Sequence, residues 1–424
     1  MKLLPILKAL RFNNRSTSEL RAISRADWPR LLDETDREGL TLSLGIRCRG
    51  LLPPMIQVRI DHNLDSNAQR HARLLTAYAE IADALQSRNL EFAVLKGLSK
   101  ARFYAADLRF RPQYDIDLYV PAQSLDDARK AMEKLGYEAL PEGPGRISDH
   151  LPRMIRKTGW RWRQDYFDPE MPTAVELHFQ FWNERDERFG AGDLAPFWTR
   201  RVIREVAGLQ LPALNETDAL SYSALHMMRH FFHGALQWHH VYEMAHFLDT
   251  SAANGPFWSE WSETGLKSCR VLEGIAFRLA VEWFHCSLHP AARRTIDELP
   301  EPVQRWFQLF ASGPSCRNEL RNDLLLHLSL VQSSRDRREL ILRRLFPVRQ
   351  GRITLDAHVP QHQMTFVMCL RDFLYKSQFV IKRFVSHART MASTVWGSLR
   401  WTADEKWRTR PRLSSHRKHL SETF

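Results

Sequence analysis

The sequence predicts an α+β fold, in which a small mixed β-sheet lies between N-terminal helices and a large helical C-terminal region. Apolar residues recur at helical spacing through residues 1–85 and again from about residue 216 onward. Strand-like alternation is confined to the stretch between these regions. We therefore expect four parts: N-terminal helices (1–85), a core that contains the sheet (86–215), a helical domain (216–375), and a basic amphipathic helix with a tail (376–424).

Two N-terminal segments have the apolar repeat of a helix, DWPRLLDETDREGL at 27–40 and a longer stretch at 66–88. Ser66 fits the N-cap of the second segment, because a serine side chain accepts a hydrogen bond from a free N–H of the first helical turn. Within the core, the SLDD sequence at 124–127 resembles a capping box. It predicts another helix, which Gly136 would end.

Four short segments predict the strands of the sheet. EFAVL at 91–95 is an apolar run, and residues 114–120 alternate between polar and apolar side chains. Two further alternating runs are GWRWRQDYF at 159–167 and TAVELHFQF at 173–181. Because the short turn-forming sequence DPEMP separates these two runs, we expect them to pair as a hairpin.

The strand at 114–120 carries the most informative side chains. In its DIDLYV sequence, alternation places the apolar residues on one face and both Asp115 and Asp117 on the other. Two neighbouring carboxylates repel each other unless a cation lies between them. Hard oxygen ligands suit Mg²⁺ or Mn²⁺, and these ions usually hold phosphate as well. The pair therefore predicts a metal site that handles phosphate.

Three other features support this prediction. Lys96 and Gly97 end a strand and open a predicted helix at 98–106, where backbone N–H groups and a lysine can meet phosphate. Arg111 precedes the aspartates and can either clamp a phosphate or orient a carboxylate. Glu176 supplies a third carboxylate on the polar face of its strand. Together these residues match a two-metal phosphoryl-transfer site, where paired ions stabilise the attacking and leaving oxygens.

These motifs resemble those of a known superfamily. A glycine-containing turn, a short helix, an Asp-x-Asp strand and a later acidic strand are similar to the nucleotidyltransferase fold of the polymerase β type. More narrowly, VLKGLSKARFY, RPQYDIDLYV and AVELHFQF resemble the bacterial uncharacterised nucleotidyltransferase family, NTP-transferase family five. The resemblance is specific over residues 91–182 and extends more loosely into the helical C-terminal part.

The resemblance implies that Asp115, Asp117 and Glu176 bind catalytic Mg²⁺ or Mn²⁺, and that Glu176 also positions or deprotonates the attacking hydroxyl. It further implies that four residues hold the phosphates of the nucleoside triphosphate (NTP): Lys96, Gly97, Ser99 and Arg111. The superfamily usually has Gly-Ser or Gly-Gly at this turn. Here Leu98 follows the glycine, and the serine comes one position later.

The implied reaction moves a nucleoside monophosphate from an NTP to an acceptor hydroxyl, which belongs to an unknown small molecule, protein or RNA. One alternative is a catalytically inactive nucleotide-binding or scaffold protein that uses its basic C-terminal part for association. A regulator that binds nucleic acid is a third interpretation, and the confinement of the excess charge to the C-terminal part disfavours it.

Several histidines near these motifs have more than one interpretation. His178 shares a strand face with Glu176, so it either supports the site or is a hydrogen-bonded strand histidine. His226 and His230 have a spacing that can bind zinc, but HMMRH lacks the acid of the zinc protease motif. We therefore favour packed histidines on a helix. Glu243 is a candidate to reach the nucleotide cleft from the helical domain.

The net charge of +12 is concentrated at the C-terminal end. Residues 331–424 contain 19 Lys and Arg against seven Asp and Glu, so the rest of the chain is neutral and is not a general polyanion binder. An apolar stripe with helical spacing runs from Phe384 to Leu399, with basic residues beside it. The simplest interpretation is a docked helix with a solvated basic face. The alternatives are contact with an anionic membrane or with a polyanion.

The five cysteines are scattered, odd in number and without a CxxC motif, which predicts no disulfide partner and a reducing compartment. The first residues lack the pattern of a signal peptide, and no apolar run approaches the length of a membrane-spanning helix. We expect a cytoplasmic protein.

Overall fold

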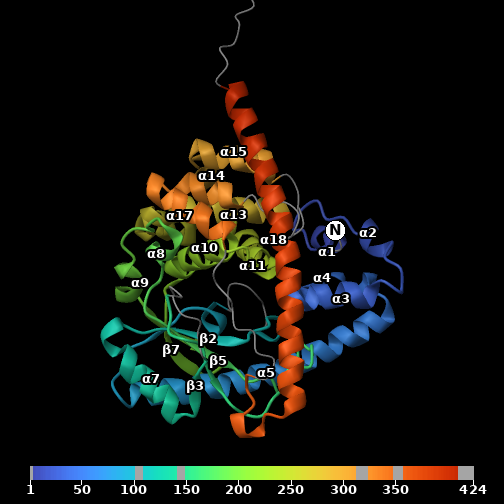
Figure 1. Cartoon of the computed structure of the whole chain (residues 1–424). Coiled ribbons are helices and arrows are strands. Elements are labelled where there is room, and N and C mark those ends of the chain that lie inside the picture. Colours follow the sequence, from blue (N-terminus) through green and yellow to red (C-terminus); the bar gives the residue numbers. More distant parts are fainter. Residues whose placement is uncertain (1–2, 101–107, 141–148, 312–322, 347–356, 409–424) are drawn as a thin grey trace, which may run out of the picture.

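The computed structural model describes residues 3–100, 108–140, 149–311, 323–346 and 357–408. Within these residues a mixed seven-stranded sheet lies below a large helical layer, with the N-terminal helices beside both (Figure 1). The predicted α+β class is therefore confirmed.

The strand order in the sheet is β3-β4-β5-β2-β1-β7-β6. The strands are β1 Ala93–Val94, β2 Asp115–Tyr119, β3 Tyr137–Ala139, β4 Met154–Arg156, β5 Ala174–His178, β6 Val202–Val206 and β7 Leu209–Ala213. The central strands β2 and β5 are parallel, and β1 is antiparallel to β2 but parallel to β7. In the β2–β5 register Asp117 is the partner of Glu176, so the two acid-bearing strands meet in the middle of the sheet.

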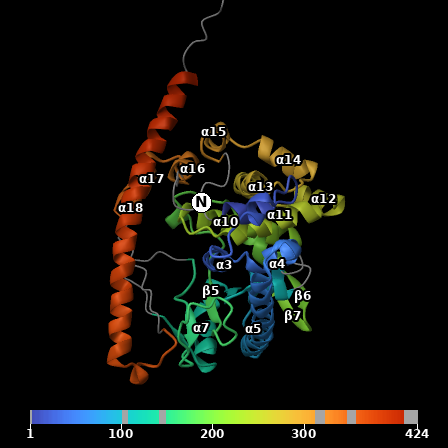
Figure 2. The same cartoon turned by 90° about the vertical axis from the view of Figure 1, so that its right-hand side faces the viewer.

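One face of the sheet packs against helices α5 (Pro54–Gln86) and α7 (Leu125–Lys134), which lie beneath it in Figure 2. Ile116 and Leu118 of β2 and Leu177 of β5 belong to one buried apolar cluster with residues of both helices. Burial of these alternate residues directs the intervening polar residues of β2 and β5 to the opposite face. That opposite face points toward the helical layer.

The N-terminal region is helical, as predicted, in α1 (Leu4–Ala9), α2 (Ser18–Arg21), α3 (Trp28–Arg37), α4 (Thr41–Cys48) and α5. The prediction of Ser66 as an N-cap is wrong. Helix α5 begins at Pro54, a favoured first residue of a helix, and Ser66 is buried in its interior. Apolar residues upstream, Ile56 and Ile60, extend the buried face of the helix past the predicted start.

The predicted hairpin is also wrong. Of its two runs only the second forms a strand, β5, and the antiparallel neighbour of β5 is β4. The first run turns instead, because Trp160 Nε1 donates to Asp168 Oδ2 at 2.9 Å. The carboxylates of Asp165 and Asp168 also accept backbone N–H groups two residues later, as in aspartate turns.

The other local predictions of the core had mixed outcomes. Helix α7 ends at Lys134 with Leu135 as its C-cap, and Gly136 follows with φ +83°, as predicted. The Ser124 side chain makes no capping hydrogen bond. Residues 97–100 form a 3₁₀ turn, η2, and the rest of the helix predicted at 98–106 lies outside the described residues.

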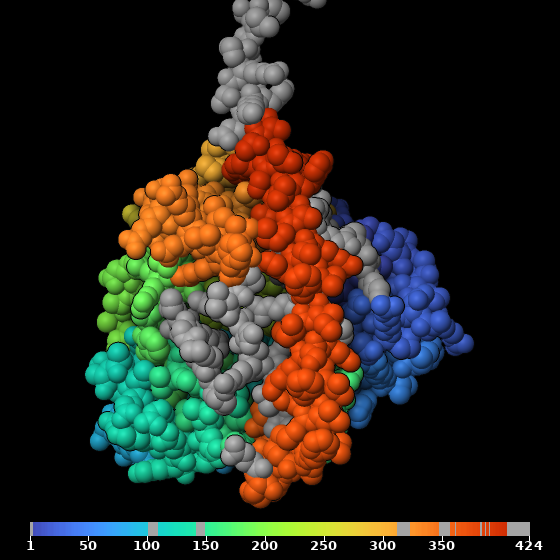
Figure 3. All heavy atoms as spheres, in the orientation of Figure 1, coloured from blue at the N-terminus to red at the C-terminus, as the bar shows by residue number. Residues whose placement is uncertain are grey.

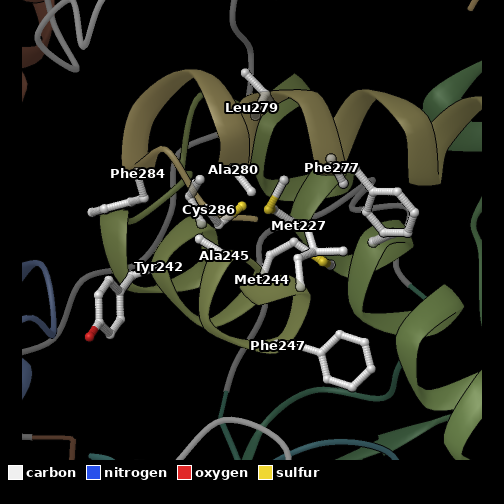
Figure 4. Packing of buried hydrophobic residues seen from close by; sticks show 14 of the residues in the cluster. Met227, Tyr242, Met244, Ala245, Phe247, Phe277, Leu279, Ala280, Phe284 and Cys286 are labelled. Atoms are coloured by element: carbon white, nitrogen blue, oxygen red, sulfur yellow. The ribbon is translucent and has the colours of Figure 1, made fainter. Parts of the chain in front are cut away.

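The helical layer follows the sheet. After the short helices α8 (Glu184–Glu187) and α9 (Ala195–Thr199) it contains α10 Glu216–Phe232, α11 Trp238–Ser251, α12 Gly255–Thr264, α13 Arg270–Phe284, α14 Pro290–Asp297, α15 Glu301–Phe310, α16 Asp323–Leu330 and α17 Ser334–Leu345. Met227, Met244 and Ala280 gather where α10, α11 and α13 meet (Figure 4). The same cluster includes Trp28 of α3, so N-terminal helices pack onto this layer.

A single long helix, α18 (Phe366–Arg408), runs along the outer side of the molecule (Figures 1 and 2). No helix among the described residues is both long and apolar enough to cross a membrane. The four cysteines in the described part of the chain are free thiols, of which Cys48, Cys269 and Cys286 are buried.

Candidate active site

The three predicted acids converge on the polar face of the sheet. Asp117 and Glu176 are register partners, and oxygen atoms of both lie within 4.8 Å of each other and of a ring nitrogen of His178. Asp115 is linked to Glu176 through Arg153, whose Nη2 atom lies 3.6 Å from Asp115 Oδ2 and 2.7 Å from Glu176 Oε1. Residues 61 positions apart in the chain thus form one carboxylate cluster.

Cations from the surrounding elements compensate these carboxylates. Lys96 Nζ lies 2.7 Å from Asp117 Oδ1, and His178 Nε2 lies 3.1 Å from the same oxygen. The other ring nitrogen of His178 lies 3.3 Å from Asp149 Oδ2. Arg229 of α10 also pairs with Asp149, which extends the network from the sheet into the helical layer.

His178 acts as a bridge between carboxylates in this network. Burial opposes protonation of its ring, but Tyr222 and hydrogen bonds to three surrounding carboxylates raise its pKa well above the usual value. A doubly protonated imidazole donates from both nitrogens and has no free lone pair for a metal ion. In this protonated form His178 is suited to orient Asp117 and Glu176, and once deprotonated its ring nitrogen lies close enough to both carboxylates to share a metal ion with them.

The two aspartates of β2 differ in their electrostatic environment. Burial and the neighbouring Asp117 carboxylate raise the pKa of Asp115 to about 6. Burial acts in the same direction on Asp117, but Lys96 and the hydrogen bond with His178 outweigh it and lower that pKa. Asp115 is the carboxyl group with less positive charge around it, so an added divalent cation would stabilise its ionised form most.

The Lys96–Gly97 turn requires a glycine. Gly97 has φ +67°, and a Cβ atom at this position would collide with the Gln113 side chain. Gln113 Nε2 in turn donates to the Asp115 carbonyl at 2.7 Å and to Tyr78 Oη at 3.0 Å. The close approach of turn and strand brings Lys96 to Asp117.

The remaining predicted phosphate-binding residues have local partners. The buried Ser99 hydroxyl donates to the Lys96 carbonyl at 3.3 Å, inside the turn. Arg111 Nε lies 2.9 Å from Glu243 Oε1 on α11. Glu243 therefore does reach the site from the helical layer. Arg111 can rearrange to meet phosphate only by weakening this ion pair.

A cavity of about 340 Å³ separates the carboxylates from the helical layer. Its sheet side contains Lys96, Gly97, Arg111, Asp115 and Asp117. Glu176 and Ser99 are not part of its lining, whereas Arg153, which binds Glu176, is. The volume lies within the range of small-molecule sites.

Histidines form the opposite wall of the cavity. His226 Nε2 lies 3.0 Å from His230 Nε2 and 3.1 Å from Lys96 Nζ, and the His240 ring stacks on His230 with centroids 4.9 Å apart. Burial lowers the pKa of all three histidines, so they are neutral at pH 7. Their nitrogens are close enough for a shared metal ion. The adjacent Lys96 ammonium opposes a second divalent cation, so we interpret them as a polar wall.

Several functional candidates carry no signal in the sequence. Arg153 and Asp149 lie in an irregular stretch after a Pro/Gly-rich loop, and nothing local marks them as partners of Glu176 and His178. Lys100 is a buried residue of the cavity lining with its ammonium 5.4 Å from the Tyr222 ring centroid, and burial lowers its pKa to about 7. Only the apposition of sheet and helical layer brings these groups together.

Comparison with known proteins agrees with the resemblance seen in the motifs. A family model described as an uncharacterised nucleotidyltransferase matches residues 24–285, which include the sheet, the carboxylates and helices α10 and α11. No curated protein and no solved structure matches the chain.

Proposed function

Because the chain belongs to the uncharacterised nucleotidyltransferase family, we propose that it transfers a nucleoside monophosphate from an NTP to an acceptor hydroxyl. The acceptor belongs to a small molecule, a protein or an RNA. The observation that carries the proposal is the convergence of Asp115, Asp117 and Glu176 beside Lys96 at the floor of a cavity.

The donor set fits Mg²⁺ or Mn²⁺. Asp115, Asp117 and Glu176 would hold the ions, and they offer the hard oxygen atoms that both ions prefer. When bound, the ions would neutralise negative charge that builds up on the phosphoryl oxygens. The raised pKa of Asp115 supports the assignment, because this carboxyl group gains most from an added cation.

Basic side chains around the cavity would hold the triphosphate. Lys96, Lys100, Arg111 and Arg153 all line the cavity, and the polyphosphate chain of an NTP carries several negative charges. The Lys96 ammonium has three N–H donors and contacts Asp117 and His226, so it can also donate to a phosphate while it stays paired with the carboxylate. Positioning by these groups is expected to contribute much of the catalysis, since phosphoryl transfer needs little covalent participation from the protein.

One observation favours a second candidate, a nucleotide-binding protein that does not turn its nucleotide over. Arg153 makes two hydrogen bonds to Glu176 Oε1, at 2.7 and 2.9 Å, and so occupies the oxygen that a metal ion would need. If Arg153 does not withdraw when nucleotide binds, Glu176 is left with Oε2 alone, which lies 3.6 Å from His178 Nε2.

The test is incubation of the protein with each α-labelled NTP, Mg²⁺ or Mn²⁺ and a cell extract, followed by identification of the labelled product. We expect label transfer by the wild type and by Asp126→Asn, which changes an exposed aspartate on α7. Asp117→Asn should lose both transfer and Mn²⁺ binding measured by calorimetry. Metal-dependent NTP binding without transfer would support the second candidate, and equal transfer by all three proteins would refute the assigned site.

A further inference from the structure

The outward side of α18 is an extensive surface that the proposed function does not use. The helix lies on the near face of the molecule in Figure 1 and at its outer edge in Figure 2. In the space-filling view it stands in front of the other elements over most of its length (Figure 3). Its 43 residues extend over about 65 Å at the rise of an α-helix.

One side of α18 attaches it to the protein. Met368 and Asp372 are buried. Near the other end Asp404 Oδ2 lies 2.7 Å from Arg305 Nε, and the Arg305 guanidinium lies 4.1 Å from the Trp401 ring centroid. At about 100° per residue, these four helix positions fall within about 60° of one another around the axis. This inner side therefore determines which side of the helix faces outward.

The opposite side of α18 is apolar. Thirteen large apolar or aromatic residues of the helix are exposed, and twelve of them fall within an arc of about 160° that faces away from the inner side. Phe366, Phe373, Phe384 and Trp396 belong to this arc, with exposed fractions of 65–81%. Ten of the thirteen lie between Phe366 and Val385 and three between Val395 and Leu399. An exposed apolar surface of this extent is costly in water and commonly indicates an interaction site.

Arginines follow one edge of the apolar arc. Arg371, Arg389 and Arg400 are exposed and lie within about 40° of its last apolar position. This arrangement places the guanidinium groups of Arg371 and Arg389 at the boundary between apolar and polar surroundings, whereas the Arg400 guanidinium lies over the Phe310 ring of α15, 5.8 Å from its centroid. At a bilayer surface that boundary is the level of the lipid phosphates, which bind arginine well.

We propose that α18 binds the surface of an anionic lipid bilayer, with its apolar arc among the upper acyl chains and its arginines at the lipid phosphates. The arc is much wider than the narrow seam that one partner helix would cover in a coiled coil. A nucleic acid would engage the arginines and leave the apolar residues in water. Since α18 is too polar to span a membrane, the helix would lie along the surface.

The test uses the full chain in a vesicle flotation assay. We expect it to float with vesicles of equal parts phosphatidylcholine and phosphatidylglycerol, to float poorly with phosphatidylcholine alone, and to lose binding as salt is raised. Val380→Glu, in the middle of the arc, should weaken partitioning into the anionic vesicles by about tenfold or more. The matched control is Val58→Glu on α5, where the valine is also exposed (69% against 59%).

Both substitutions lie on exposed surface, so both variants should unfold at the temperature of the wild type, and unfolding curves check this. The proposal is overturned if the wild type does not float, or if Val380→Glu and Val58→Glu float equally well. It is also overturned if the wild type is a dimer that Val380→Glu dissociates without any vesicle binding. Binding to RNA but not to vesicles would refute it in favour of a polyanion partner.

Discussion

Replacing Asp117 and Asp115 by asparagine, one at a time, should change the stability of the metal-free protein in opposite directions. Asp117 is 2% exposed and pairs with Lys96 at 2.7 Å and with His178 at 3.1 Å. Asp117→Asn leaves both cations buried without this countercharge. Loss of one partner of a buried ion pair costs about 3–5 kcal/mol, so we expect the free energy of unfolding to fall by that amount.

Asp115 has the opposite balance, because its environment disfavours the charge. Its pKa rises from 3.8 to about 6, so at pH 7 the folded protein holds a carboxylate that costs about 3 kcal/mol at 1.36 kcal/mol per pKa unit. The side chain keeps 30% of its surface exposed, and solvent screens part of this cost. We therefore expect Asp115→Asn to raise the free energy of unfolding by about 1–2 kcal/mol.

The pH dependence of this gain has a definite sign. Between pH 3.8 and 6 the folded wild type retains a proton that the unfolded chain has released, so wild-type stability falls as pH rises through this window. The advantage of Asp115→Asn should therefore be full above pH 6 and shrink toward zero as pH falls to 3.8. At pH 7, added Mn²⁺ should make the wild type more stable than Asp115→Asn, because only the wild type retains all three carboxylates.

Urea unfolding at pH 7 with a chelator, repeated with Mn²⁺, measures these changes. The control is again Asp126→Asn, which should stay within about 0.5 kcal/mol of the wild type because its side chain is exposed. Equal losses of stability in Asp115→Asn and Asp117→Asn would show that the two carboxylates share one environment. That result would refute the electrostatic reasoning.

Three further outcomes are expected. Gly97→Ala should lower the free energy of unfolding by about 2 kcal/mol more than Gly136→Ala. Both glycines have positive φ, but only at Gly97 would a Cβ atom collide with a neighbour, the Gln113 side chain. Urea unfolding of both variants measures this difference. A chelator should stop label transfer and Mg²⁺ or Mn²⁺ should restore it, whereas transfer that persists without metal would contradict the carboxylate site. Burial lowers the pKa of His327 from 6.5 to about 3. Below pH 6.5 the unfolded chain therefore takes up a proton that the folded protein does not. The free energy of unfolding should fall by about 2 kcal/mol as the pH is lowered from 6.5 to 5. His327→Gln should remove this part of the pH dependence, and an unchanged dependence in urea unfolding would contradict it.

Local periodicity predicted much of the fold correctly. The polar and apolar residues of β2 alternate, so the shared face of Asp115 and Asp117 followed from the sequence, as did the face of Glu176 on β5. The helical N-terminal and C-terminal regions followed from apolar spacing in the same way. These features depend on residues within a few positions of one another, and local chain geometry relates such residues.

Local patterns failed where a distant partner decides the structure. The run at 159–167 alternates like a strand, yet its aspartates and Trp160 form turns and β4 takes the place beside β5. Ser66 has the chemistry of an N-cap, but burial of the residues before it extends α5 upstream. Propensity is a weak preference that tertiary packing can override.

For the site, the sequence predicted the acids, the glycine turn and the metal chemistry that they would suit. Strand pairing then set Glu176 opposite Asp117, and the packing of α10 and α11 over the sheet added Arg229, Glu243 and the histidine wall. The reason is physical: the charge on a buried group depends on what surrounds it in space. Groups such as Arg153 and Asp149 acquire partners only when segments remote in the sequence come together.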